Sequence, residues 1–264
     1  GVFGQTGRGT SLTDVSAPAP GSFPVSAEGG ITLGRDHPSV RGCSGRGVTV
    51  AVIDSGVHAE HPHVGSVAGG IAIEPDGETH ADYLDRLGHG TAVTAAILDK
   101  APDVDIQAVK VFGRKLATSS GALVKAIDWA VEQGARLINL SLGTAKSGGD
   151  LVLWASVRRA VEGGVLIVSP LEYEGRVWLP GSLAGVAGVT LDWGCPRDEV
   201  RAAPSPAGEG VFVASGFPRP IPGVPAEANL QGVSFATANV TGILACLLED
   251  RPEIRSLCHR MTSS

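Results

Sequence analysis

Residues 48–54 read Val-Thr-Val-Ala-Val-Ile-Asp, a run of β-branched and small apolar residues that ends in a carboxylate. A nearly continuous apolar run of this length is typical of a strand that is buried on both faces of a parallel sheet. Ser55 and Gly56 follow it and predict a turn. The stretch therefore predicts an inner strand whose last side chain, Asp54, lies at the carboxyl edge of the sheet.

Outward from this strand, strand-like and helix-like segments alternate along the chain. Strands are expected at 105–112, 137–142, 165–169, 185–191 and 210–214, and helices at 90–98, 121–133, 151–161 and from near Ser234. Such alternation is typical of an α/β fold with a mostly parallel central sheet and helices on both faces. Residues 1–30 are rich in Gly, Ser, Pro and Ala without apolar periodicity, which predicts an extended arm. We therefore expect one α/β domain over residues 31–264.

Composition excludes several classes of partner. The chain has 264 residues, 43% of them hydrophobic, which is enough for a core of its own. Its net charge is −6, and its basic residues are scattered, so it lacks the basic stripe of a nucleic-acid-binding protein. No apolar run is long enough to cross a membrane, and residues 1–30 lack the pattern of a secretion signal. We expect no nucleic-acid or membrane partner, while a removed signal or pro-segment stays open because the chain begins without Met.

The cysteines carry no expected chemistry. Cys43, Cys195, Cys246 and Cys258 form no CxxC pair and are too few for a disulfide scaffold, so four ordinary thiols are expected. Cys246 lies in an apolar run and is expected to be buried. Unpaired thiols and the missing signal favour the cytoplasm, and secretion is the alternative.

Three residues stand where reactive groups gather in such folds, at the carboxyl ends of strands and the starts of the following helices. Asp54 ends its strand, His89 lies in Gly-His-Gly-Thr at a helix start, and Ser234 opens the last helix. Singly, each is more often a turn, loop or cap residue. Together they match the set of acid, base and nucleophile that hydrolyses acyl bonds. The positive end of its helix is expected to keep His89 neutral, and that of the last helix favours an oxyanion beside Ser234.

From about Gly47 to Met261 the chain resembles the subtilisin-like serine proteases. The resemblance is carried by Val-Ile-Asp54-Ser-Gly-Val with His61-Pro62 downstream, by Gly-His89-Gly-Thr-Ala-Val, and by Gly-Val-Ser234-Phe-Ala-Thr. It implies a three-layer α/β sandwich and a serine endopeptidase that cuts extended peptide or protein segments. Asp54, His89 and Ser234 would form the catalytic triad, with an acyl-enzyme on Ser234. No cofactor is expected.

The resemblance also implies substrate-binding residues. The segment 138–143 resembles the strand that pairs with the substrate, which makes Ser141, Leu142 and Gly143 candidates. Trp-Leu-Pro-Gly at 178–181 resembles a wall of the first specificity pocket. Glu174 has a position that borders this pocket, so a basic side chain before the cut is one expectation and simple exposure on a loop is the other.

One departure concerns the oxyanion. The family supplies a donor from an Asn that follows a core strand, and Tyr173 takes this position here. Either its hydroxyl donates a hydrogen bond to the oxyanion, or its ring only packs against other side chains. This departure motivates one alternative function, a degenerate protease that binds peptides.

The other departures from the family concern a metal-binding loop and the last helix. The loop after Leu98 is too short for the calcium loop of secreted family members, and we expect no metal, even at His58, His61 and His63. Ala238 replaces the family's Pro and should leave the last helix straighter, while Phe235 replaces a Met beside the nucleophile. These two changes motivate the second alternative, a peptide ligase or macrocyclase that uses the same acyl-enzyme.

Overall fold

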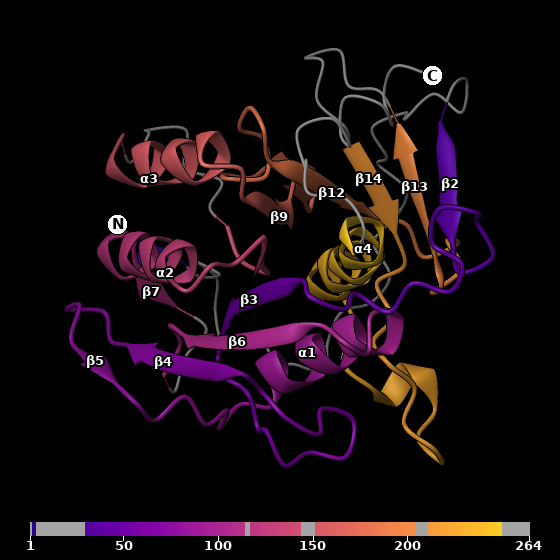
Figure 1. Cartoon of the computed structure of the whole chain (residues 1–264), viewed down its shortest axis with the longest axis horizontal. Coiled ribbons are helices and arrows are strands. Elements are labelled where there is room, and N and C mark those ends of the chain that lie inside the picture. The colour runs from indigo at the N-terminus through magenta and orange to yellow at the C-terminus, as the bar shows by residue number, and fades with distance from the viewer. Residues whose placement is uncertain (1, 4–29, 114–116, 144–150, 204–210, 250–264) are drawn as a thin grey trace.

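A ten-stranded sheet forms the middle of the molecule (Figure 1). The computed structural model describes residues 2–3, 30–113, 117–143, 151–203 and 211–249. In spatial order the strands are β2 (Ile31–Gly34), β13 (Glu199–Ala203), β14 (Val211–Ala214), β12 (Ala187–Leu191), β9 (Leu166–Pro170), β8 (Leu137–Leu140), β3 (Thr49–Asp54), β6 (Asp105–Lys110), β4 (Gly69–Ile73) and β5 (Thr79–His80). From β14 to β4 all neighbours are parallel, whereas β13 and β5 pair antiparallel to theirs.

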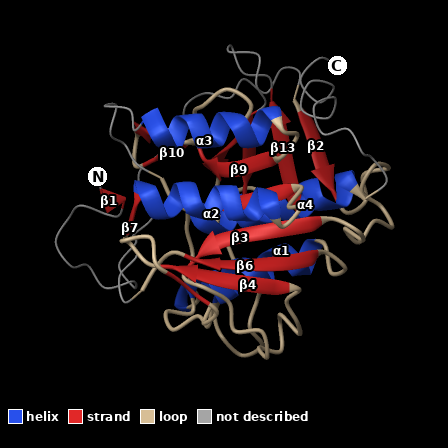
Figure 2. Cartoon of the chain, turned by 60° about the vertical axis from the view of Figure 1, so that its left-hand side comes forward, coloured by secondary structure: helices blue, strands red, loops and turns tan. Residues whose placement is uncertain are grey.

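Helices cover both faces of this sheet. On one face lie α1 (His89–Lys100) and α4 (Val233–Leu248), and on the other α2 (Ser120–Glu132) and α3 (Leu151–Glu162) (Figure 2). Each pair of helices shares one apolar cluster with its face of the sheet. The expectation of a three-layer α/β sandwich is confirmed.

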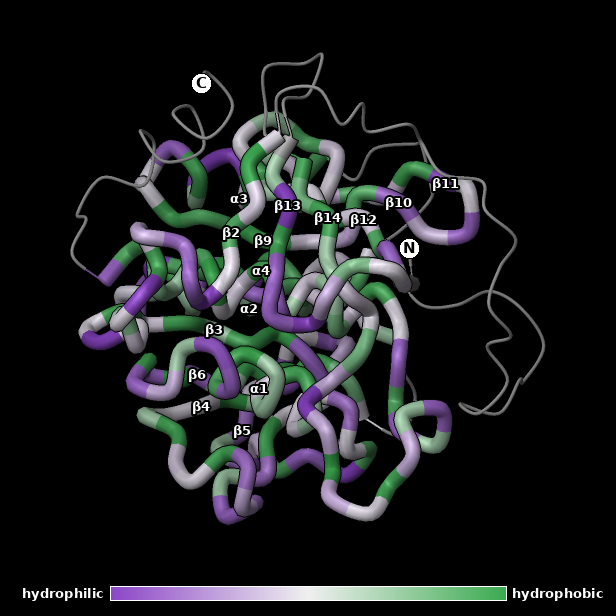
Figure 3. The backbone as a smooth tube through the Cα atoms, turned by 90° about the vertical axis from the view of Figure 1, so that its right-hand side faces the viewer, coloured by the Kyte–Doolittle hydropathy of each residue, from purple (hydrophilic) through white to green (hydrophobic). Residues whose placement is uncertain are grey.

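β3 shows how the sequence builds both clusters at once. Val50 and Val52 are fully buried in the cluster of α1 and α4, and Ala51 and Ile53 in the cluster of α2 and α3. Because side chains alternate between the faces of a strand, Asp54 falls on the side of α1 and α4. In Figure 3 the apolar colour gathers in the inner strands and α4, and the surrounding loops are mostly polar.

The order of the strands places a switch point beside β3. After β3 the chain adds β4 and β6 on one side of it, then crosses through α2 and adds β8, β9, β12 and β14 on the other side. In open α/β sheets ligands bind beyond the carboxyl ends of the strands where the direction of winding reverses. Asp54, at the end of β3, and Ser141, directly after β8, lie at this point.

The sequence located the four helices and six strands of the main sheet to within about two residues, and it missed β2, β4, β5 and β13. Two further pairs of strands lie outside the main sheet: β1 (Val2–Phe3) with β7 (Thr118–Ser119), and β10 (Glu172–Tyr173) with β11 (Arg176–Val177). The expected arm therefore starts with a short strand, and its residues 4–29 lie outside the described part. α4 continues without interruption past the buried Ala238.

Two expectations from the composition concern the state of the cysteines and membrane-spanning helices. Cys195 and Cys246 are free thiols, with Cys246 buried as expected, the thiol of Cys43 lies 3.9 Å from the carbonyl oxygen of Ser39, and Cys258 lies outside the described residues. No described helix has the length and apolar character needed to traverse a bilayer.

Candidate active site

Asp54 and His89 form the best-defined pair of the site. Nδ1 of His89 lies 2.7 Å from Oδ1 of Asp54. Asp54 is fully buried, and the same oxygen accepts the N–H of Ser55 at 2.7 Å. The other oxygen, Oδ2, is buried and has no partner among the described residues. A buried carboxylate of this kind fixes the tautomer of the imidazole, leaving Nε2 free to accept a proton.

The glycines around His89 are required by close backbone contact. A Cβ at Gly90 would lie 2.2 Å from the carbonyl oxygen of Gly56, which is far inside van der Waals contact. Gly88, which precedes α1, has φ +81°, a conformation that side chains rarely adopt. Gly-His-Gly therefore allows α1 to begin directly against the turn that follows β3.

Asp85 holds the start of α1 and was missed by the sequence analysis. Its buried carboxylate accepts the N–H groups of Leu87, Gly88 and Thr91 and the hydroxyls of Thr91 and Ser55, at 2.7 to 2.9 Å. Gly88 has no side chain to cap the helix, so Asp85 satisfies N–H groups that would otherwise lack an acceptor. An Asp three residues before Gly-His-Gly is the sequence signal for this role.

Two carboxylates, Asp54 and Asp85, influence the pKa of His89. Burial of the ring lowers the pKa of His89, but the charge and hydrogen bond of Asp54 and the charge of Asp85 raise it by more, so it lies above its ordinary value. The effect of the helix end, which was expected to keep His89 neutral, is therefore opposed by two carboxylates. As a base, His89 is active above its pKa.

We expect Asp85→Asn to act on both stability and pH dependence. Losing the buried acceptor should lower the free energy of unfolding by roughly 1–3 kcal/mol. Removing its charge lowers the pKa of His89, so the rise of kcat/KM with pH should move to lower pH. Chemical denaturation and a pH–rate profile measure the two effects.

Asp82→Asn is the matched control, because this side chain is exposed and pairs with Arg86 at the surface. The role assigned to Asp85 is contradicted if the two variants give the same stability and the same pH profile.

Ser234 is the second residue of α4, so its backbone N–H has no acceptor within the helix. Its hydroxyl donates to the carbonyl oxygen of Ser141 at 3.3 Å, and within the described residues no hydrogen bond joins it to His89. The ring centroid of the next residue, Phe235, lies 5.8 Å from that of His89. The structure thus brings Ser234 into the neighbourhood of the pair Asp54 and His89, where catalytic hydrogen bonds are often loose before substrate binds.

The segment after β8 is fixed from two sides. Nδ2 of Asn139 donates to Oγ of Ser141 at 2.8 Å, and Oδ1 of Asn139 accepts the hydroxyl of Thr241 on α4 at 2.9 Å. Gly143 packs so tightly on Trp178 that a Cβ there would lie 2.6 Å from the indole. Ser141 therefore contacts Ser234 and Gly143 packs on the Trp-Leu-Pro-Gly segment, while the substrate-binding role of Ser141, Leu142 and Gly143 stays a prediction.

Tyr173 and Glu174 belong to the small hairpin of β10 and β11. Glu174 and Gly175 form its two-residue turn, with φ of +52° and +72°, the left-handed pair typical of a type I′ turn. Glu174 is exposed at this turn. The ring of Tyr173 contacts Trp178 at 5.5 Å between centroids, and burial together with Glu174 raises the pKa of its hydroxyl. Within the part of the chain that the structure describes, no hydrogen bond joins Tyr173 or Glu174 to Ser234, and the oxyanion role of Tyr173 stays a prediction.

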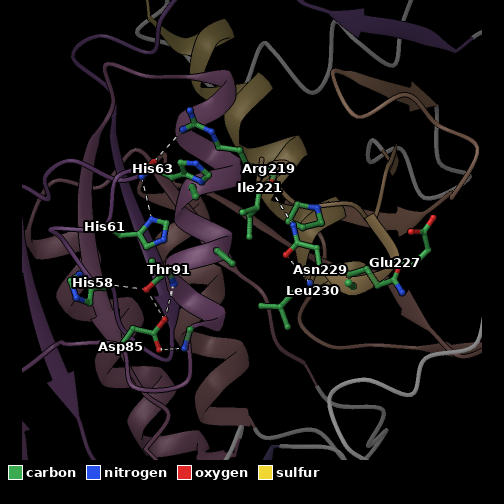
Figure 4. A pocket seen from close by; sticks show the side chains of 16 residues that line it. His58, His61, His63, Asp85, Thr91, Arg219, Ile221, Glu227, Asn229 and Leu230 are labelled. Carbon is green, nitrogen blue, oxygen red and sulfur yellow. Dashed lines mark hydrogen bonds between the residues drawn. The ribbon is translucent and has the colours of Figure 1, made fainter. Parts of the chain in front are cut away.

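The three histidines after β3 line a pocket of about 500 Å³ beside the start of α1 (Figure 4). The rings of His61 and His63 contact each other edge to face, with 5.3 Å between centroids. No group of three His, Cys, Asp or Glu side chains in the described part of the chain is arranged to hold a metal ion.

Comparison with known proteins shows sequence similarity to one family and to several proteases. The profile of the Subtilase family matches residues 45–169. A thermostable alkaline protease of Halalkalibacterium halodurans is 32% identical over 234 residues, which cover 80% of this chain and 60% of that protein. Subtilisin Savinase of Lederbergia lenta is 31% identical over 231 residues, with 80% of each chain covered. The chain thus spans about three-fifths of the length of the first relative.

A solved structure supports the same fold. The protease domain of PatA, as a serine-to-alanine mutant, matches with a TM-score of 0.59 at 24% identity and covers 81% of this chain and 82% of that one. The similarity in sequence covers 80% of this chain and the similarity in fold covers 81% of it.

Proposed function

The chain belongs to the subtilase family, and from this we propose that it is a serine endopeptidase whose catalytic triad is Asp54, His89 and Ser234. The observation that carries the proposal is the 2.7 Å contact between His89 and the buried Asp54, next to the helix start that bears Ser234. Peptide or protein segments are the proposed substrates.

The roles of the three residues follow from their surroundings. Oγ of Ser234 attacks the peptide carbonyl while Nε2 of His89 takes its proton. The charge of Asp54 stabilises the imidazolium that forms, and its hydrogen bond holds Nδ1 protonated. His89 then gives the proton to the leaving amine, and water resolves the acyl-enzyme by the reverse steps.

Two donors are proposed for the oxyanion. The free N–H of Ser234 lies at the N-terminus of α4, where the helix also offers partial positive charge. The hydroxyl of Tyr173 is the second candidate. Its raised pKa keeps it protonated at neutral pH, as a donor must be, and it follows β9, the neighbour of β8.

We expect Tyr173→Phe to lower kcat by about tenfold or more while KM changes little, because only a hydrogen bond to the developing charge is lost. Steady-state kinetics on one peptide measures both constants. Unchanged kcat would leave Tyr173 with its packing on Trp178 alone.

Cleavage itself is tested with a mixture of synthetic peptides analysed by mass spectrometry. The native chain should produce fragments cut within the peptides, and Ser234→Ala should produce none. Fragments from both proteins, or from neither, would contradict the proposal. Joined peptides in place of fragments would favour a ligase over a hydrolase.

A further inference from the structure

Four cationic side chains gather around one aspartate at the end of α1. The carboxylate oxygen Oδ2 of Asp99 accepts from Nη2 of Arg197 at 2.6 Å and from Nζ of Lys100 at 2.8 Å. Nε of Arg219 lies 3.7 Å from the other oxygen, Oδ1, and Arg35 donates to the backbone carbonyl of Asp99. These five residues therefore meet at one place, and we call them the Asp99 cluster.

The cluster joins parts of the chain that are far apart in the sequence. Arg35 follows β2, Arg197 lies between β12 and β13, and Arg219 belongs to the segment between β14 and α4. The basic residues look scattered along the sequence, but the fold collects four of them around the end of α1.

The positive groups of the cluster outnumber its negative ones. The arginines are charged at any physiological pH, and Lys100, whose pKa burial lowers to about 8, is mostly charged at pH 7. Although burial alone would raise the pKa of Asp99, Lys100 and Arg197 hold it at about 2, so this carboxylate is ionised. No other described carboxylate forms an ion pair with any of the four cations. The end of α1 adds only about half a negative charge, so the cations repel one another unless a further anion binds.

One donor of the cluster lacks an acceptor. Nη1 of Arg197 is buried and makes no hydrogen bond within the described residues. An unpaired buried donor on a charged group costs free energy, so native structures rarely leave one without a partner. Nη1 belongs to the same planar guanidinium as the Nη2 that binds Asp99, and the donor therefore lies inside the cluster. The fork of a guanidinium matches the oxygens of an oxyanion.

The cluster is partly open to solvent. The side chains of Arg197 and Arg219 are 24% and 35% exposed, whereas that of Lys100 is fully buried. An anion can reach the two guanidinium groups from solution, while Lys100 adds positive charge from beneath them. Because water screens partly buried charges less than exposed ones, such a site attracts an anion more strongly than arginines on an open surface do.

We propose that the Asp99 cluster binds a divalent oxyanion of the phosphate type through the guanidinium groups of Arg35, Arg197 and Arg219. This site goes beyond the proposed protease function and does not depend on it. Since the three arginines come from three different segments, a bound anion stabilises their attachment to the end of α1.

Phosphate and chloride are compared at equal pH and ionic strength. We expect about 10 mM phosphate to raise the melting temperature by about 2–5 °C more than chloride does, the shift that a Kd near 1 mM gives. Isothermal titration calorimetry should show one phosphate per chain. Phosphoserine distinguishes two sources of the anion: tighter binding than that of phosphate identifies a phosphorylated side chain as the ligand, and weaker binding identifies the free ion.

Variants locate the binding in the cluster. Arg197→Met removes the unpaired donor and should weaken phosphate binding by about tenfold or more. Arg159→Met is the matched control, because Arg159 also pairs with one aspartate, Asp128, but is 58% exposed on α3. The shift caused by phosphate is compared within each protein, so that a change in basal stability does not enter. Arg197→Lys keeps the positive charge without the fork, replaces Arg197→Met if that variant does not fold, and should weaken binding by about threefold or more.

His63 reports whether the anion binds at this place. Burial and the charge of Arg219 lower the pKa of His63, and the charge of Asp99 raises it. An anion beside Arg219 should therefore raise the pKa of His63. NMR titration of the histidine ring protons with and without phosphate measures this change, and His63→Gln identifies the signal.

Three results would overturn the proposal. Equal shifts of the melting temperature in phosphate and chloride would show an effect of ionic strength alone. An equal response of the native protein and Arg197→Met to phosphate, or an unchanged pKa of His63, would show an adventitious ion only, bound elsewhere. None of these measurements uses catalytic activity, so the protease proposal stands or fails separately.

Discussion

Replacing Ser234 by Ala is expected to lower kcat by a factor on the order of 10⁴ to 10⁶, the range for loss of a triad nucleophile. Without Oγ no acyl-enzyme forms, and the remaining acceleration comes only from the oxyanion donors and from substrate binding. KM should change little. Among the described residues the hydroxyl makes one hydrogen bond, to the carbonyl of Ser141, so the fold should survive, as circular dichroism and the melting temperature would show.

The double variant tests whether the residues act as one unit. His89→Ala should lose about as much activity as Ser234→Ala, and combining the two should cost little more than either alone. Losses that multiply, or a Ser234→Ala protein with near-native kcat, would exclude the triad assignment.

Asp54→Asn is expected to have a smaller but still large effect, a fall in kcat of about 10⁴-fold. Oδ1 of Asp54 accepts both the N–H of Ser55 and the imidazole of His89. An amide supplies no charge to stabilise the imidazolium and favours the wrong tautomer of the ring. Because Asp54 raises the pKa of His89, the residual activity should rise with pH at lower pH than in the native protein.

Asp105→Asn serves as control for this variant, since Asp105 is an exposed aspartate at the start of the neighbouring strand β6. It should retain native kcat within about twofold, as surface changes usually do. Native-like activity of Asp54→Asn would show that another group orients His89.

The sequence predicted the elements whose burial is periodic or continuous. β3 was found from Val48 to Asp54 because both of its faces are buried, and α4 because a long apolar segment follows Ser234. β4 begins with two glycines and β13 contains Glu199 and Arg201, so neither has the pattern of an inner strand. Their positions depend on pairing with distant strands, which local sequence does not encode.

For the site, residue types and chain order were enough to predict where Asp54, His89 and Ser234 gather, but not what supports them. The role of Asp85 depends on N–H groups that become free only when α1 starts at His89. The pKa of His89 depends on two carboxylates whose approach requires the turn at Gly56. Both are properties of the folded backbone.

The histidines near residue 60 illustrate the same limit. Spacing alone raised the question of a metal site, whereas the structure places His58, His61 and His63 along one wall of a pocket whose other walls come from α1 and the segment before α4. The opposite wall, with Ile221 and Leu230, is more than 150 residues away in the sequence for each of them. No local pattern connects the two walls.

The central claim is that Ser234 is a nucleophile activated by His89, and labelling with a fluorophosphonate tests it most directly. Oγ attacks phosphorus, fluoride leaves, and the protein gains one stable adduct that peptide mapping by mass spectrometry can locate. The account predicts a single adduct on Ser234 in the native protein, strongly reduced labelling of His89→Ala, and none of Ser234→Ala. A folded native protein that stays unlabelled, or that is labelled equally well without His89, would contradict it.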